Sequence, residues 1–388
     1  MTLTNQSHGL VKLDANGNYS GGITLSDDVR MEHVKILSDK SILIAGTLDG
    51  GGGDVDPGPG IVNINPSTGA KHIFILKLDS AFNFADVKII ETLDTLWLYN
   101  PLVLTDFNVD AMGSLYISGK FLGEIDFDPG PGQYLQNYIP PGGQPYDVYS
   151  QGKYFVVKLN SAMDLDKVSF FSTKLQSLSV TDPFNNIYLY GECKGNVDMD
   201  PGPGVTLINN TITNDVFYIA KYDSLFNLVW VKSTENDYLS SSTLRYGKNQ
   251  SLNLVCYLYD SLGSNGFGIH QYDCDYSNGS EFYTFFVNLD TSGIAKQSIN
   301  LGKSYSIGST ACIYGTQNNF YMSGRISDVT DIEAGPGITL KGAFPNSSYN
   351  FLYPITAPTH TSAKSEEMPL LIKMVTTLKM LMKAVRKD

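Results

Sequence analysis

The stretch Asp126-Phe-Asp-Pro-Gly-Pro-Gly132 recurs almost unchanged along this chain of 388 residues. Two further copies read Asp54-Val-Asp-Pro-Gly-Pro-Gly60 and Asp198-Met-Asp-Pro-Gly-Pro-Gly204, so the three begin 72 residues apart (126 − 54 and 198 − 126). A degenerate fourth copy, Asp331-Ile-Glu-Ala-Gly-Pro-Gly337, follows 133 residues later (331 − 198), which is close to two more periods. A fixed period of this kind indicates a repeat architecture.

Proline chemistry predicts that each heptapeptide is a loop. Proline fixes φ and lacks an N–H group, so no central strand can run through the segment. Each Pro-Gly pair suits a type II turn, in which the glycine adopts a positive φ. The residue before proline is extended, and we therefore expect the two acids of each loop to point the same way.

Two carboxylates on one side repel unless donors or a cation lie between them. One interpretation is that the Asp oxygens accept backbone N–H groups of the turn. The other is calcium, which binds carboxylate and carbonyl oxygens, although the loop lacks the complete ligand set of an EF-hand. The candidate calcium ligands are Asp54, Asp56, Asp126, Asp128, Asp198, Asp200, Asp331 and Glu333.

Two strand patterns recur with the same period. Apolar runs that end in Lys-Leu-Asp or a variant, such as Phe74-Ile-Leu-Lys-Leu-Asp79, indicate the first strand of a hairpin. A second pattern precedes each acid loop, as in Gly113-Ser-Leu-Tyr-Ile-Ser-Gly119, and another apolar segment lies ahead of it. One period therefore reads as four strands, which is the make-up of a propeller blade.

The sequence thus predicts an all-β fold, a β-propeller of about five four-stranded blades, over residues 1–355. Residues 1–24 look like half a blade, which either closes the ring with the last unit or shows that the chain is a piece of a longer protein. The expected units span residues 25–95, 96–172, 173–235, 236–300 and 301–355.

The segment after residue 355 departs from the repeat. Residues 356–388 are predicted to be a linker and an amphipathic helix, because apolar residues from Leu370 to Val385 recur at helical spacing. Lys383, Arg386 and Lys387 suit the end of such a helix. This basic helix is expected to contact a partner or a membrane surface, to pack on the acidic body, or to be a non-native extension.

Composition excludes several classes of protein. The net charge of −12 argues against a nucleic-acid partner. No apolar run is long enough for a transmembrane span, and the first residues lack the features of a signal peptide. The four cysteines have no C-x-x-C spacing. Cys256 and Cys312 are expected to be buried thiols, whereas Cys193 and Cys274 look loop-like and are candidates for a disulfide.

The combination of the Gly-ending strand, the Asp-Phe-Asp-Pro-Gly-Pro-Gly loop and the Val-Lys-Leu-Asp strand resembles the SBBP-type β-propeller repeats of bacterial surface and secreted proteins. The resemblance covers roughly residues 9–350 and is most specific in residues 40–232. It implies an extracellular or cell-surface protein, and it carries over no catalytic residues.

No arrangement of catalytic residues is found in the sequence. The five histidines form no His-Glu-x-x-His pair, and no Gly-x-Ser-x-Gly elbow occurs. We therefore expect a non-enzymatic scaffold for binding or adhesion to a protein or glycan ligand. The insertion at residues 133–153 is a candidate for specificity, with Tyr134, Tyr138, Tyr146 and Tyr149 as candidate stacking side chains. The alternatives are a carbohydrate-active enzyme with a site in the central channel, and a purely structural spacer.

Overall fold

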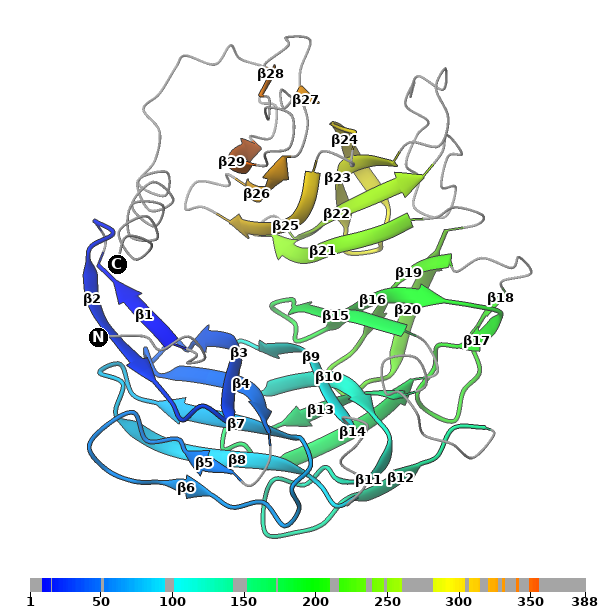
Figure 1. Cartoon of the computed structure of the whole chain (residues 1–388). Coiled ribbons are helices and arrows are strands. Elements are labelled where there is room, and N and C mark those ends of the chain that lie inside the picture. The colour runs from blue at the N-terminus through cyan, green and yellow to red at the C-terminus, as the bar shows by residue number, and fades with distance from the viewer. Residues whose placement is uncertain are drawn as a thin grey trace.

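The described part of the chain consists of β-strands, turns and loops, which confirms the all-β class (Figure 1). No helix occurs in that part. The tail at 356–388, predicted to be helical, lies outside it. The computed structural model describes residues 9–14, 16–49, 52–94, 101–141, 152–171, 174–209, 216–234, 239–247, 250–259, 282–303, 307–314, 320–326, 330–331, 340–341 and 349–355.

The recurring element is an antiparallel sheet of four strands that pair in chain order. The first sheet contains β3 (Val29–Ile36), β4 (Ile42–Leu48), β7 (His72–Leu78) and β8 (Phe84–Thr92). The second contains β9 (Leu102–Val109), β10 (Leu115–Phe121), β13 (Lys153–Leu159) and β14 (Leu165–Phe171). The third contains β15 (Lys174–Thr181), β16 (Ile187–Cys193), β19 (Val216–Tyr222) and β20 (Leu228–Ser233). The fourth contains β21 (Leu239–Gly247), β22 (Ser251–Tyr259), β23 (Phe282–Asp290) and β24 (Ala295–Lys303), so it continues past the expected boundary at 300.

The two ends of the described chain form smaller sheets. The last contains β25 (Ile307–Tyr314), β26 (Phe320–Ile326) and β29 (Tyr349–Ile355). The first is the hairpin of β1 (Gly9–Leu13) and β2 (Tyr19–Thr24). Among the described residues, no strand pairing joins these two sheets.

A short hairpin flanks each acid loop, which the sequence analysis did not anticipate. The four hairpins are β5 (Gly53–Asp54) with β6 (Asn63–Ile64), β11 (Gly123–Asp126) with β12 (Leu135–Tyr138), β17 (Asn196–Asp198) with β18 (Leu207–Asn209), and β27 (Thr330–Asp331) with β28 (Leu340–Lys341). β11 also pairs with β8 of the preceding sheet, with Ile125 opposite Thr92. This hairpin therefore covers an edge strand that would otherwise expose unpaired backbone groups.

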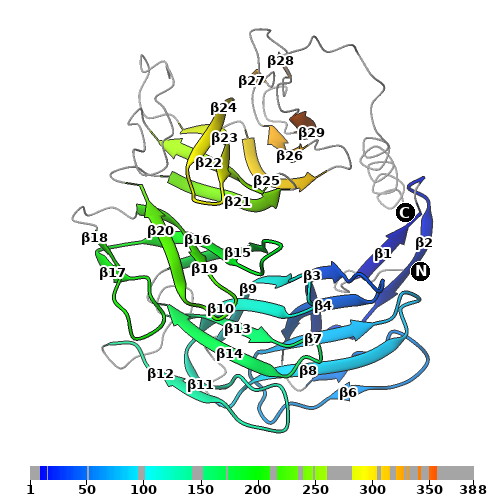
Figure 2. The same cartoon turned by 180° about the vertical axis from the view of Figure 1, so that it is seen from behind.

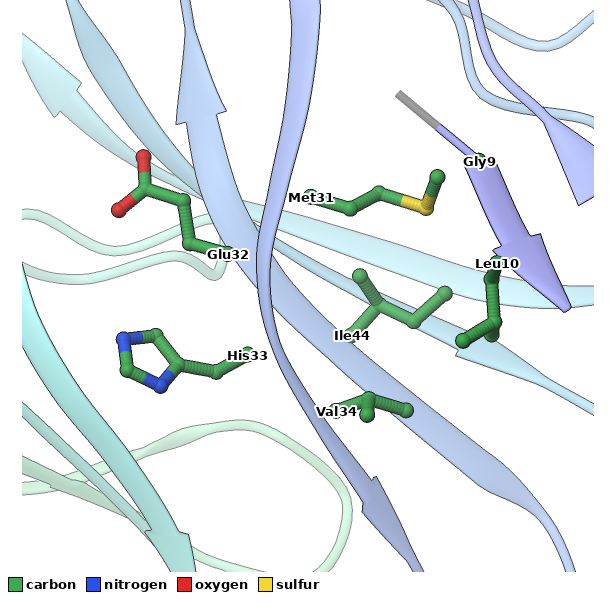
Figure 3. Close-up of a pocket in the computed structure, with 7 residues that line it drawn as sticks. All are labelled: Gly9, Leu10, Met31, Glu32, His33, Val34 and Ile44. Atoms are coloured by element: carbon green, nitrogen blue, oxygen red, sulfur yellow. The ribbon is translucent and has the colours of Figure 1, made fainter. Parts of the chain in front are cut away.

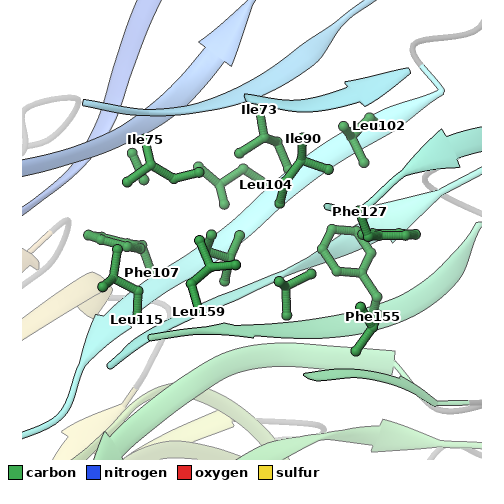
Figure 4. Packing of buried hydrophobic residues seen from close by; sticks show 14 of the residues in the cluster. Ile73, Ile75, Ile90, Leu102, Leu104, Phe107, Leu115, Phe127, Phe155 and Leu159 are labelled. Carbon is green, nitrogen blue, oxygen red and sulfur yellow. The ribbon is translucent and has the colours of Figure 1, made fainter. Parts of the chain in front are cut away.

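The hydrophobic core lies between successive sheets. Ile75 and Ile90 of the first sheet pack with Phe107 and Phe155 of the second (Figure 4). Side chains alternate between the faces of a strand, and Phe74, beside Ile75, belongs to the cluster on the opposite face. Burial on both faces explains why these strands read as continuous apolar runs.

The first strands of the sheets lie next to one another along the inner side of the molecule (Figures 1 and 2). Contacts link β3 to β9, β9 to β15, β15 to β21, and β21 to β25. The side chains of these five strands are therefore the ones that several sheets bring together.

A glycine in the second strand has a packing role that explains its recurrence. Gly46 pairs with Phe74, and Gly119 pairs with Phe155. A Cβ at Gly119 would lie 2.1 Å from the carbonyl oxygen of Val103 and 2.6 Å from the Phe155 ring. In the fourth sheet Cys256 holds this position opposite Phe285.

Candidate functional site

The first acid of each loop closes the loop on itself. Oδ1 of Asp126 accepts the backbone N–H groups of Asp128 at 3.0 Å and Tyr134 at 2.8 Å. The other two described copies repeat this pattern. Asp54 accepts from Asp56 and Val62, and Asp198 accepts from Asp200 and Thr206. These bonds confirm the interpretation in which the carboxylates accept backbone donors.

The second acid explains the two glycines. Oδ1 of Asp128 accepts the N–H of Gly130 at 2.8 Å, and Oδ2 lies 2.3 Å from where a Cβ at Gly132 would be. None of the glycines in the three described loops has a positive φ, so the type II turns expected there are wrong. The glycines are needed because the carboxylate approaches the backbone closely, which leaves no room for a side chain.

The residue between the two acids anchors the loop in the core. Val55, Phe127 and Met199 are each fully buried, in three different clusters. The hydroxyl of Tyr222 donates to the carbonyl of Met199 at 2.8 Å. The loop is therefore held by a buried side chain as well as by its own hydrogen bonds.

The calcium assignment stays a prediction. Of the fourth copy, Asp331 lies at the end of β27, and Glu333 falls outside the described residues. Within the described chain, no group of three or more His, Cys, Asp or Glu side chains could hold a metal ion. In each described loop one oxygen of each acid is already engaged by the backbone.

A charged cluster on the inner strands is a second candidate site, which sequence reasoning missed. Nδ1 of His33 on β3 lies 3.7 Å from Oδ1 of Asp106 on β9. Burial lowers the pKa of His33, although the Asp106 carboxylate opposes this shift. Burial likewise lowers the pKa of Lys35, and the charge of Arg245 on β21 adds to that effect. Three sheets thus contribute charges to one partly desolvated region.

A groove of about 400 Å³ lies beside β2 and is a third candidate. Its lining includes Lys12, Tyr19, Gly21, Phe82 and Asn83. The residue Tyr19 is 61% exposed. Such a combination of exposed aromatic surface with ammonium and amide groups is typical of small-ligand sites.

The groove is open because Gly21 lacks a side chain. Gly21 lies opposite Lys12, and Trp230 lies opposite the equivalent Lys221 in the third sheet. Gly21 and Trp230 therefore occupy equivalent positions. Trp230 reaches the next sheet, where its Nε1 donates to the carbonyl of Thr291 at 3.1 Å. The equivalent Lys167 donates to the carbonyl of Leu225. Comparison of these pairing positions between repeats could have revealed the groove from the sequence.

The other predicted residues have mixed outcomes. Tyr134 is 38% exposed, whereas the ring of Tyr138 packs on Phe121. Tyr146 and Tyr149 lie outside the described residues. Of the cysteines, Cys256 is buried as expected, and burial raises its pKa.

The expectation for Cys193 is wrong, because this residue is buried at the end of β16 and is not in a loop. Cys274 and the side chain of Cys312 are not described.

Comparisons with known proteins supply no family. No protein-family model matches the chain, and no curated protein matches it. Among solved structures, a protein of unknown function from Bacteroides caccae is similar over 58% of this chain and 89% of its own, at 10% identity and a TM-score of 0.19. A likeness at that level carries no argument about fold or function. Within the described residues, no helix has the length and apolar character needed to cross a membrane.

Proposed function

We propose that this chain is a non-enzymatic binding or adhesion scaffold whose successive sheets are blades of a β-propeller. Four sheets repeat one four-stranded pattern, and their first strands contact one another in sequence order. Short meanders arranged with their first strands inward are the elements from which propellers are built. The secreted or cell-surface setting rests on the resemblance of the repeats to SBBP-type proteins.

The groove beside β2 carries the proposal of a binding role. The three described acid loops share one hydrogen-bond pattern, which favours an architectural role for them. The groove, in contrast, lies where Gly21 stands at the position held by Lys167 and Trp230 in the second and third sheets and by Asp86 in the first. Its lining includes Tyr19, Ser20, Lys12 and Asn83, and it is held in place because Nζ of Lys12 donates to the Ser80 carbonyl and the Asn83 amide donates to Asp79. Ring faces and hydroxyl groups of a glycan match this combination, because an aromatic face packs on apolar surface while the polar groups fix the orientation.

A glycan-binding panel tests the proposal. Wild-type protein is expected to retain specific glycans, and Tyr19→Ala is expected to weaken that binding by about two- to tenfold, since aromatic contacts of this kind are worth about 0.5–1.5 kcal/mol. Phe184→Ala is the matched control, because Phe184 is also an exposed aromatic residue, at 72%, and lies outside the groove. The proposal is wrong if no glycan binds, or if Tyr19→Ala and Phe184→Ala behave alike. Replacement of residues 142–151 by a glycine-serine linker of the same length leaves β12 and β13 in place, and it abolishes binding if the ligand contacts the predicted insertion at 133–153.

The rival function is a carbohydrate-active enzyme with its site on the inner strands. The one observation that favours it is the cluster of His33, Asp106 and Arg245 contributed by three sheets. This reading predicts turnover of a glycan substrate that is lost in His33→Gln. A structural spacer, in contrast, predicts neither turnover nor ligand binding, and it predicts that changes in the groove have no effect.

A further inference from the structure

The hairpin of β1 and β2 resembles the third and fourth strands of a complete sheet. Within the described chain, no first and second strands belong to this sheet. β1 carries the Lys-Leu-Asp pattern, and Asp14 closes its turn by accepting the N–H groups of Asn16 and Asn18, both at 2.8 Å. Asp79 closes the equivalent turn after β7 in the same way. In the complete sheets the third strand pairs on both edges, for example β7 with β4 and β8. Within the described chain, β1 pairs with β2 alone.

Exposure of apolar side chains on β3 marks the place of the two strands that this sheet lacks. Val34 occupies the position of Phe107 on β9, and it is 45% exposed, whereas Phe107 is fully buried. Ile36 occupies the position of Val109, which packs on the same cluster as Phe107, and it is 74% exposed. Both residues are exposed where their repeat equivalents are covered by the preceding sheet.

A cavity joins the open edge of β1 to the exposed face of β3. It measures about 200 Å³ and is lined by Gly9 and Leu10 of β1, by residues of β3, and by Ile44. Figure 3 shows Met31 and Val34 directed to the side where Leu10 lies, with Glu32 and His33 on the other side of β3. The bulge between Met31 and His33 allows these neighbours to separate in this way.

We propose that this slot, bounded by β1 and the apolar face of β3, receives a two-stranded antiparallel hairpin from a partner polypeptide that carries the first- and second-strand pattern of these repeats. The N–H and C=O groups on the open edge of β1 need partners, and an added strand supplies them. The four complete sheets each place such a hairpin beside the third strand. The hairpin formed by β9 and β10 is the model for the occupant, because its Tyr116 packs against the following sheet, as the corresponding side chain of the occupant would pack against Val34. The inference is independent of the glycan groove, which involves the turn end of the same hairpin.

A synthetic peptide of residues 101–122, which contains β9 and β10, tests this inference on the full chain. Binding of the peptide is expected to slow hydrogen exchange at the amides on the open edge of β1, which do not donate to β2 and are expected to exchange rapidly in its absence. Val34→Asp is expected to weaken binding by about tenfold or more, because the carboxylate would be buried without a partner. Val229→Asp is the control, since Val229 is also an exposed strand valine, at 52%, and lies on β20, away from the slot. A peptide with Tyr116→Asp, which places a carboxylate on the face that packs on the following sheet, should not bind.

A fusion provides a second measurement if the peptide is insoluble. An extra copy of residues 101–154 placed directly before Gly9, which corresponds to Phe155, supplies the hairpin with its own loop, and it is expected to raise the Tm and to protect the same amides. The proposal is overturned if neither the peptide nor the fusion protects the open-edge amides of β1. It is also overturned if these open-edge amides are already protected in the unmodified protein, because the last sheet of the chain or a second copy would then fill the slot.

Discussion

Individual side chains in the repeats act mainly on the backbone around them. The acids of the loops accept N–H groups, and the glycines leave room for carboxylates, rings and carbonyl oxygens. The sequence shows that these residues recur, but it does not show why. The loop glycines were predicted to adopt a positive φ, whereas steric approach of Asp128 and its equivalents is the reason for them. A turn propensity describes backbone angles, so it does not report that a carboxylate lies close to a glycine four residues later.

The glycine opposite each aromatic residue gives a direct test at this scale. Gly119→Val is expected to destabilise the protein by about 2–3 kcal/mol, because the new side chain would collide with the Val103 carbonyl and the Phe155 ring. Urea unfolding measures the change. Gly69→Ala is the control and should be nearly neutral, since a Cβ there meets nothing within 4 Å. Equal stability of the two variants would contradict the packing role.

Asp79, which closes the turn between β7 and β8, predicts that the stability of the protein depends on pH. The hydrogen bond from the Asn83 side chain, with the N–H groups of Asn83 and Ala81, lowers the pKa of Asp79. A carboxyl whose pKa is lower in the folded state adds stability above its unfolded pKa of about 3.9, and that stability is lost as the pH falls through the folded pKa. Wild type should therefore exceed Asp79→Ala in Tm at pH 6, and this difference should shrink towards pH 2. A constant difference would contradict the argument. Asp79→Asn is expected to stay close to wild type, because Asn160 makes the same backbone bonds in the second sheet.

At the scale of the element, the strand patterns were predictable but the contacts between sheets were not. Apolar runs that end in Lys-Leu-Asp located β7, β13 and β19 well. The role of the lysine appears only in three dimensions, where Nζ of Lys12 donates to the carbonyl of Ser80 at 3.0 Å and Nζ of Lys158 donates to that of Ser224 at 3.1 Å. Each bond joins the third strand of one sheet to the hairpin turn of the next.

The turns themselves carry a further feature that the sequence hides. Phe82, Met163 and Phe226 each adopt a positive φ at the fourth position of the turn. Met163 and Phe226 are almost fully buried. A large apolar residue in this conformation is uncommon and strained, and burial of its side chain offsets the strain. Turn propensities favour glycine here, as at Gly17 and Gly293, so they give no signal for these anchors.

Removal of one lysine tests the contact between sheets. Lys158→Met is expected to destabilise the protein by about 1–2 kcal/mol, because the Ser224 carbonyl loses a charged donor and the pair with Asp166 is broken. Lys296→Met is the control, since its exposed ion pair with Asp290 should contribute less than about 1 kcal/mol. The proposed role of Lys158 in joining the sheets is wrong if Lys158→Met and Lys296→Met lower the free energy of unfolding by the same amount.

At the scale of the whole molecule, neighbouring sheets share their cores. The repeat period predicted serial units, and the sheets follow it, but the sequence did not show that β11 pairs with the preceding sheet or that charges meet on the inner strands. Such contacts join residues from different periods, so no pattern within one period reports them. The departure at Gly21 is visible only when equivalent pairing positions are compared.

Loss of a shared core residue should therefore affect two sheets at once. Phe155→Ala removes a fully buried ring that contacts Phe121 and Phe127 and packs with Ile75 of the first sheet. The expected cost is about 3–5 kcal/mol. Native-state hydrogen exchange should show faster exchange in β4 and β7 as well as in β10 and β13. An effect confined to the second sheet would contradict the shared core.

The central claim is that the repeated acids are structural acceptors of backbone N–H groups, and Asp126 tests it most directly. Thermal melts of wild type, Asp126→Asn and Asp126→Ala are compared in excess EGTA and in millimolar calcium. We expect Asp126→Asn to melt close to wild type, because an amide oxygen can accept the same two bonds. Asp126→Ala should lose about 1–3 kcal/mol in both buffers, since the N–H groups of Asp128 and Tyr134 lose their acceptor. A Tm of the wild type that rises by several degrees only with calcium, together with an Asn variant as damaged as the Ala variant, would contradict the claim and assign the loops to calcium instead.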